Sequence, residues 1–113
     1  MNPTDLHHLT ALAMSEEELQ TAVTHMATLC GWRSYHTYNS RRSNPGFPDL
    51  VLTRRGRLLF VELKSQRGKV RPEQQDWLND LDEVERKTGG LVMARLWRPS
   101  SWGCGEVEEV LRG

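Results

Sequence analysis

The side chains best suited to chemistry in this chain are Asp49, Glu62 and Lys64. Glu62 and Lys64 lie two residues apart in the apolar run Leu58 to Lys64, which predicts a strand, so their side chains project from the same face. Asp49 opens the preceding apolar run. The glycine-containing stretch Thr53 to Arg57 joins the two runs and predicts a β-hairpin, which would bring Asp49 close to Glu62.

Charged side chains on a half-buried strand face need a partner, because burying an uncompensated charge costs free energy. Asp49 and Glu62 would repel each other at close range unless a cation lay between them. Carboxylate oxygens are the ligands that Mg²⁺ and Mn²⁺ prefer. We therefore expect Asp49 and Glu62 to bind one of these ions, with the Lys64 ammonium beside them.

The elements that must position these residues can be predicted from the remaining pattern. Ser15 followed by three glutamates predicts a helix start, and apolar residues at helical spacing continue the helix until Gly31. Pro72-Glu73 opens a second long helix, which ends near Gly89. Further strands are predicted at 32–38 and 91–97, a loop at 39–48, a turn at 98–100 and a terminal helix at 107–111. The resulting order, αβββαβα, predicts a three-layer α/β fold with a mixed sheet between helices.

Tryptophans and apolar stripes mark the expected core. Three tryptophans fall on apolar stripes, and we expect them in the core rather than as base-stacking platforms: Trp32, Trp77 and Trp97. Trp102 stands between small residues, and its place is left open. The second long helix is expected to turn one stripe inward, made of Gln74, Trp77, Leu78, Leu81 and Val84.

Charge is segregated along the chain although the net charge is zero. The segment from Arg33 to Arg71 holds ten Lys and Arg residues against two acids, a formal charge of +8, and the remainder holds five against thirteen, or −8. Such segregation predicts one basic face, which would supply the phosphate contacts of a nucleic-acid-binding protein. A solvated cluster of basic loops would give the same pattern.

Composition argues against several other classes of protein. Cys30, Cys104 and the four scattered histidines form no zinc-ligand pattern, so we expect packed thiols and no zinc site. No apolar run is long enough for a membrane span, and the N-terminal residues lack the pattern of a signal peptide, which predicts a cytoplasmic protein. The length suits one domain, expected at 15–113 after an N-terminal arm at 1–14.

A set of motifs resembles a known nuclease family. Pro48-Asp49 followed by Glu62-Leu63-Lys64 resembles the signature of the PD-(D/E)XK nucleases. More narrowly, the chain resembles the VRR-NUC branch, which includes stand-alone phage and bacterial nucleases, in the segments Gly46 to Leu50, Glu62 to Lys64 and Pro72 to Gln74 together with Gly68, Trp77 and Leu78. The resemblance runs from about Ser15 to Pro99.

The resemblance implies a restriction-endonuclease-like fold and a Mg²⁺- or Mn²⁺-dependent DNA endonuclease. It implies metal ligation by Asp49 and Glu62, with Leu63 included in the metal site, and a catalytic role for Lys64. The family's glutamine after this strand matches Gln74, with Gln75 as a one-residue alternative. Its glutamate near the start of the first helix matches Glu16, which shares the core-facing stripe, and Glu18 is the rival.

In such an enzyme a metal ion held by Asp49 and Glu62 would supply polarisation of a phosphoryl oxygen and a more acidic bound water, and Lys64 would orient that water or offset charge in the transition state. Gln74 would bind the attacking water, orient Lys64 or simply cap the helix. Four basic residues in the flanking loops are candidates for DNA phosphate contacts: Arg41, Arg42, Lys69 and Arg71.

The resemblance leaves the substrate open among a Holliday junction, a flap, a nick and plain duplex DNA. It implies a homodimer, because a small chain needs a partner to act on two strands symmetrically. Two other classes remain: a catalytically inactive DNA-binding module of the same fold, and an α/β interaction protein whose charges form structural ion pairs. Metal affinity and salt-dependent DNA binding would exclude the last class.

Overall fold

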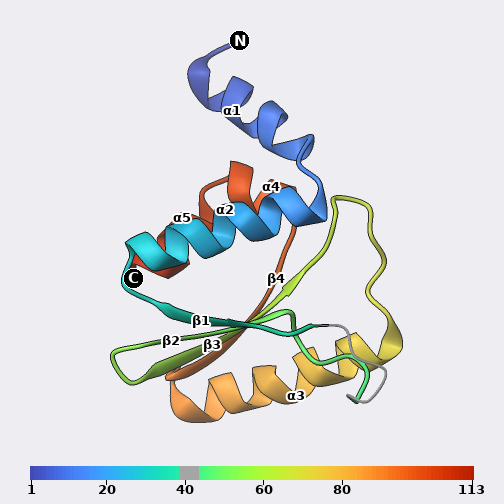
Figure 1. The fold of residues 1–113 in the computed structure, drawn as a ribbon, viewed down its shortest axis with the longest axis vertical. Helices are drawn as coiled ribbons and strands as arrows, with labels where there is room; N and C mark the ends of the chain where they lie inside the picture. The colour runs from blue at the N-terminus through green and yellow to red at the C-terminus, as the bar shows by residue number, and fades with distance from the viewer. Residues whose placement is uncertain (39–43) are drawn as a thin grey trace.

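Figure 1 shows the fold in a computed structural model, which describes residues 1–38 and 44–113. Four strands form one sheet, and five helices lie around it in the described part of the chain. Their bounds are α1 Pro3–Leu12, α2 Glu16–Leu29, β1 Arg33–His36, β2 Leu50–Arg54, β3 Arg57–Leu63, α3 Pro72–Thr88, β4 Val92–Trp97, α4 Pro99–Gly103 and α5 Glu106–Arg112.

The sheet has the order β1-β2-β3-β4, with antiparallel pairs β1–β2 and β2–β3 and a parallel pair β3–β4. Helix α3 makes the crossover to β4 on one face of the sheet, and α2, α4 and α5 lie on the other (Figure 1). The predicted three-layer α/β fold with a mixed sheet is confirmed. None of the helices described here is long and apolar enough to cross a membrane.

Strand β3 is the central element that divides the core from the site. Leu59, Val61 and Leu63 have no exposed surface and pack in the core beneath α2 and α5. The alternating residues Phe60 and Glu62 face the opposite way, toward α3, because side chains of a strand alternate between the two faces. The predicted separation of the two sets of side chains is confirmed.

The predicted helix starts are present in the structure. The Ser15 hydroxyl accepts the Glu18 N–H at 3.0 Å, and the Glu18 carboxylate accepts the Ser15 N–H at 3.1 Å, which forms the capping box of α2. Helix α3 begins at Pro72 and ends at Thr88, and its C-cap Gly89 has a φ of 62°, the left-handed conformation common at helix ends. These two helix starts place the N-termini of α2 and α3 at the same end of the sheet (Figure 1).

Two local predictions were wrong. The turn expected at 98–100 is the start of the short helix α4, because Pro99 occupies its first position and the Ser101 hydroxyl accepts the Arg98 N–H. Val84 is 39% exposed and does not continue the inward stripe of α3. Its neighbour Glu85 faces β4 instead, where its carboxylate accepts the Ala94 N–H at 2.9 Å.

The tryptophans divide between the core and its margin. Trp32 and Trp97 are buried in the core, as predicted. Trp77 is half-buried and packs against Phe47 outside the main core, and Trp102 is half-buried against the core's edge. The N-terminal segment, which was expected to be an arm and was assigned no role, contains α1, which packs against α4.

The β2–β3 hairpin is fastened to the helical layer at the end of the sheet away from Asp49. Arg54 donates to the carbonyl oxygens of Cys30 at 3.0 Å and Leu111 at 2.8 Å, at the ends of α2 and α5. Its guanidinium lies over the Trp32 ring, 4.6 Å from the centroid. Three arginines of the basic segment, Arg54, Arg55 and Arg57, therefore lie in or beside this hairpin turn.

Candidate active site

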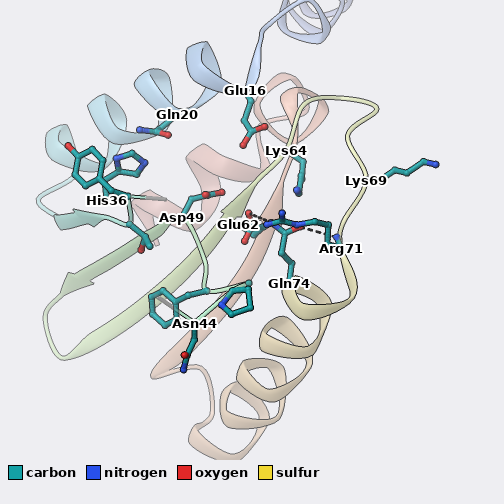
Figure 2. Close-up of a pocket in the computed structure, with 15 residues that line it drawn as sticks. Glu16, Gln20, His36, Asn44, Asp49, Glu62, Lys64, Lys69, Arg71 and Gln74 are labelled. Atoms are coloured by element: carbon teal, nitrogen blue, oxygen red, sulfur yellow. Dashed lines mark hydrogen bonds between the residues drawn. The ribbon is translucent and has the colours of Figure 1, made fainter. Parts of the chain in front are cut away.

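A cavity of about 830 Å³ opens at the end of the sheet where β2 begins and β3 ends. The first turns of α2 and α3 border it, through Glu16 and Gln74 (Figure 2). The structure brings together seven residues singled out from the sequence, all of which line this cavity: Glu16, Asp49, Glu62, Lys64, Lys69, Arg71 and Gln74.

Asp49 is held in place by the loop that precedes it. Gly46 has a φ of 90°, and its backbone lies so close to the Glu73 carbonyl that a Cβ atom would collide with it. The Phe47 ring packs edge-on against Phe60 and Trp77, with centroid distances of 6.0 and 5.1 Å. This packing joins the loop to the sheet and to α3, and so fixes the start of β2.

The Asp49 carboxylate extends the pairing of β2 with β3 by one step. Its Oδ2 accepts the N–H of Leu63 at 2.8 Å, just beyond the last backbone pair of the two strands. Since Glu62 precedes Leu63, the hydrogen bond brings the Asp49 and Glu62 carboxyl groups into contact. The predicted approach of these two residues is present in the structure.

Glu62 is an almost fully buried acid, with 2% of its surface exposed. One oxygen, Oε1, accepts a hydrogen bond from the Gln74 amide at 3.3 Å, and no N–H or O–H group donates to the other, Oε2. Burial, the hydrogen bond with Asp49 and the Asp49 charge raise the pKa of Glu62 to about 9, with a further contribution from Glu16, while Lys64 acts in the opposite direction.

Gln74 connects the start of α3 to this acid. Its Oε1 accepts the Arg71 N–H at 2.9 Å, which leaves its Nε2 to donate to Glu62 (Figure 2). The sequence left a helix cap and a site residue as alternatives for Gln74, and the two sets of contacts occur together. Gln75 is exposed and bonds to Asn79 on the outer face of α3, so Gln74 alone of the two reaches the cavity.

The two candidate glutamates of α2 lie in different surroundings. Glu18 is engaged in the capping box at the start of the helix, whereas Glu16 lines the cavity. Gln20, one helical turn after Glu16, also lines it, although the sequence analysis did not select this residue. The i, i+4 spacing from Glu16 was the signal that could have identified Gln20.

The described basic residues of the segment 33–71 lie at more than one place, and the single basic face stays a prediction. Lys64, Lys69 and Arg71 line the cavity, but the hairpin arginines lie at the other end of β2 and β3. A strand of five residues spans roughly 17 Å, so the two groups are well separated. Arg41 and Arg42 lie outside the described residues.

The carboxylates fit a hard cation, although they are few. Within residues 1–38 and 44–113 no cluster of three or more His, Cys, Asp and Glu side chains is arranged to hold a metal. Asp49 and Glu62 nevertheless offer paired oxygens, and the unbonded Glu62 Oε2 is a buried acceptor without a donor. Leu63 has a buried aliphatic side chain, so only its backbone carbonyl could act as a ligand.

Comparison with known protein families decides the family. The model of the VRR-NUC domain matches residues 5–91. The chain belongs to the VRR-NUC family. VRR-NUC is a PD-(D/E)XK-like nuclease domain, so the family implies a nuclease that acts on DNA. The VRR-NUC match includes the cavity-lining residues from Glu16 to Gln74 and ends before β4. No curated protein and no solved structure matches the chain.

Proposed function

We propose that this VRR-NUC domain is a Mg²⁺- or Mn²⁺-dependent DNA endonuclease whose site is formed by Asp49, Glu62 and Lys64. The observation that carries the proposal is the buried Glu62 carboxyl group, which contacts the half-buried Asp49 carboxyl group and whose Oε2 receives no hydrogen-bond donor, beside an ammonium group. Two ionised carboxylates in contact repel each other, so the free protein holds a proton on Glu62, and a cation would take the place of that proton. Asp49, Glu62 and the Leu63 carbonyl would hold the ion.

A divalent ion held there would supply Lewis-acid polarisation of the phosphate and a water of lowered pKa. The chain's own groups would prepare the site around it. Gln74 fixes the Glu62 carboxyl through one hydrogen bond, and the Lys64 ammonium would offset negative charge that develops on the phosphate oxygens.

We assign supporting roles to three further residues. Glu16 faces the same cavity from α2 and would bind or orient a water molecule near the phosphate. Lys69 and Arg71 are exposed residues of the segment after β3. They line the cavity and would contact the neighbouring phosphates of the DNA strand. These contacts fix the position of the strand and carry no sequence information.

We propose branched DNA, such as a flap or a Holliday junction, as the preferred substrate, and two copies of the chain as the active form. A 13.0 kDa chain with a site at one end of its sheet reaches one strand at a time. A symmetric pair of such chains would suit a substrate in which two strands must be cut.

The test is cleavage of labelled DNA by the wild-type protein and by Glu62→Gln. The panel contains plain duplex, nicked duplex, a flap and a four-way junction, each with and without Mg²⁺ or Mn²⁺. We expect metal-dependent cleavage of branched DNA by the wild type and none by the variant. Binding of these DNAs without cleavage by the wild type in either metal would contradict the proposal and indicate an inactive DNA-binding module.

A further inference from the structure

Tyr38 is an exposed aromatic residue at the edge of the candidate site. Its surface is 75% exposed, and the residue lines the cavity together with His36. Tyr35 on the same segment is 64% exposed but does not line the cavity. An exposed tyrosine beside a site for a phosphodiester has an apolar ring face available to the ligand.

The backbone fixes Tyr38 close to Asp49. Strands β1 and β2 pair His36 with Leu50, and the Thr37 N–H donates to the Asp49 carbonyl oxygen at 2.7 Å. Tyr38 is the next residue, so it follows directly from the hydrogen bond that ties β1 to the candidate metal ligand. The position of its backbone relative to Asp49 is therefore set by the sheet.

The His36 ring supports the Tyr38 ring. The two rings meet edge to face, with centroids 4.8 Å apart and an interplanar angle of 60°. This contact restricts the orientation of Tyr38 while most of its surface remains exposed. A ring held in this way is better prepared to stack on a ligand than a freely rotating one, because less conformational entropy is lost on binding.

The two walls of the cavity differ in chemistry. Figure 2 shows His36 on one side, Lys69 and Arg71 on the other, and the Asp49 and Glu62 carboxyl groups between them. A DNA strand has the same two-sided character, with phosphates on one side and bases on the other. The cavity volume of about 830 Å³ falls within the range of roughly 300–1,000 Å³ typical of small-ligand sites, so one unstacked nucleotide can enter.

On these grounds, and resting on the proposed function, we infer that Tyr38, supported by His36, is a stacking platform for one unpaired nucleobase next to the phosphate that is cut. A base inside a duplex has both faces covered by its neighbours and cannot stack on the ring. A base at a flap, gap or junction is free to do so. The platform would therefore select DNA with an unpaired nucleotide at the cleavage position.

The test is a binding cycle in EDTA, where no cleavage occurs, with fluorescently labelled flap DNA. Wild type, Tyr38→Ala, Tyr38→Phe and Tyr35→Ala are each titrated with the flap and with flaps in which one of the nucleotides beside the branch lacks its base. One stacked base contributes about 1–3 kcal/mol, so Tyr38→Ala should weaken flap binding by about tenfold. Tyr38→Phe and Tyr35→Ala should bind like the wild type.

Removal of the base at one of these positions should weaken binding by the wild type as much as Tyr38→Ala does. The same removal should not weaken binding by Tyr38→Ala any further, because the base and the ring would be partners in one contact. The inference would be overturned if the losses of affinity from the substitution and from the missing base added independently. It would also be overturned if Tyr38→Ala bound the intact flap like the wild type. The cycle requires no cleavage, so a protein that shows this coupling but cuts no DNA would refute the nuclease proposal and leave the platform intact.

Discussion

The acidity of Glu62 is set by its place on β3 rather than by its residue type. Its buried position, its contact with Asp49 and the charge of Asp49 together hold the pKa near 9, so the metal-free protein carries a proton there at neutral pH. A metal ligand must be deprotonated, and a cation would therefore displace this proton on binding. The site is a proton site in the free protein and a candidate cation site in the loaded one.

The raised pKa gives a signed prediction for the stability of the metal-free protein. A folded-state pKa above the unfolded value of 4.5 means that the native state binds this proton more tightly, so stability falls as pH rises from about 4.5 toward 9. Gln at position 62 cannot ionise. The free energy of unfolding of Glu62→Gln should therefore fall less over this range than that of the wild type, by roughly 1 kcal/mol or more. Melting temperatures in EDTA between pH 5 and pH 9 measure the difference.

Addition of Mn²⁺ near pH 8 should raise the melting temperature of the wild type and leave that of Glu62→Gln almost unchanged. Identical pH profiles for the two proteins, without an effect of Mn²⁺ on either, would show that Glu62 is not the titrating metal ligand.

The sequence was sufficient to place Asp49, Glu62 and Lys64 at one position, because strand periodicity and a hairpin determine which side chains share a face. It could not show that Gln74 bonds Glu62, since that contact depends on where α3 begins relative to β3. Tyr38 was also missed. Its place beside the cavity follows from the pairing of β1 with β2, which no local pattern encodes.

At the level of elements, α3 also protects the open edge of the sheet. Its last turns supply two side chains to outward-facing N–H groups of β4: the Thr88 hydroxyl accepts from Val92 at 3.2 Å, and the Glu85 carboxylate accepts from Ala94 at 2.9 Å. Glu85 also pairs with Arg95 at 2.7 Å. Edge strands with unpaired N–H groups invite association with other chains, and these contacts reduce that risk.

Glu85 provides a second prediction with the opposite dependence on pH. Partial burial raises its pKa, but the hydrogen bonds from Arg95 and Ala94 and the Arg95 charge outweigh burial, so the pKa lies below the ordinary 4.5. The stability that this carboxylate contributes is present above pH 4.5 and is lost as pH falls through the lowered pKa. Glu85→Gln should therefore destabilise the protein by about 1 kcal/mol at pH 7 and less at pH 3.

Glu83→Gln is the matched control for this change. Glu83 lies on the same helix and pairs with Lys87 at the surface, where both side chains are more than half exposed. Exposed ion pairs contribute little to stability, so the free energy of unfolding of this variant should lie within about 0.5 kcal/mol of that of the wild type. Equal effects of the two substitutions would show that Glu85 is an ordinary surface acid.

The order and type of the elements in the segment 15–113 could be predicted, because capping residues, prolines, glycines and periodicity are local signals. The exceptions depended on tertiary contacts. Val84 is apolar and at helical spacing, yet Glu85 takes the place facing β4 because the edge N–H groups need acceptors. The segment at Pro99 was expected to be a turn, but packing against α1 and the Ser101 cap favour a short helix.

For the whole molecule, the important feature is that the basic residues placed by the described part of the segment 33–71 include one group at the cavity and one at the hairpin turn. Lys64, Lys69 and Arg71 lie at the cavity, and Arg54 is engaged with helix ends at the far side of the sheet. The formal charge of the segment therefore overstates the charge that DNA at the site would meet. Only the group at the cavity is expected to control the dependence of binding on salt.

This separation can be tested by the slope of DNA affinity against salt concentration. Each neutralised phosphate contributes about 0.9 to the slope, so the double substitution of Lys69 and Arg71 by Ala should reduce it by about 1.8. Arg55→Ala removes an exposed arginine from the hairpin turn and should leave the slope unchanged. A loss of slope in Arg55→Ala equal to half that of the double variant would mean that DNA also contacts the hairpin.

The central claim is that the site performs catalysis as well as binding, and Lys64 separates the two most directly. Its ammonium lies beside the carboxyl pair, on the strand face that Glu62 shares, whereas Lys69 is exposed farther out on the cavity's rim. Lys64 should therefore act mainly on the charge that develops in the transition state. Lys69 should act mainly on DNA affinity.

The decisive measurement is single-turnover cleavage of branched DNA in Mg²⁺ by wild type, Lys64→Ala and Lys69→Ala, with DNA affinity measured in parallel. Lys64→Ala should lose about 100-fold or more in rate while its affinity stays within a few-fold of the wild type, as expected for the loss of a transition-state contact. Lys69→Ala should keep the wild-type rate at saturating protein. A Lys64→Ala protein that cuts at the wild-type rate would contradict the assignment of this site as the catalytic centre.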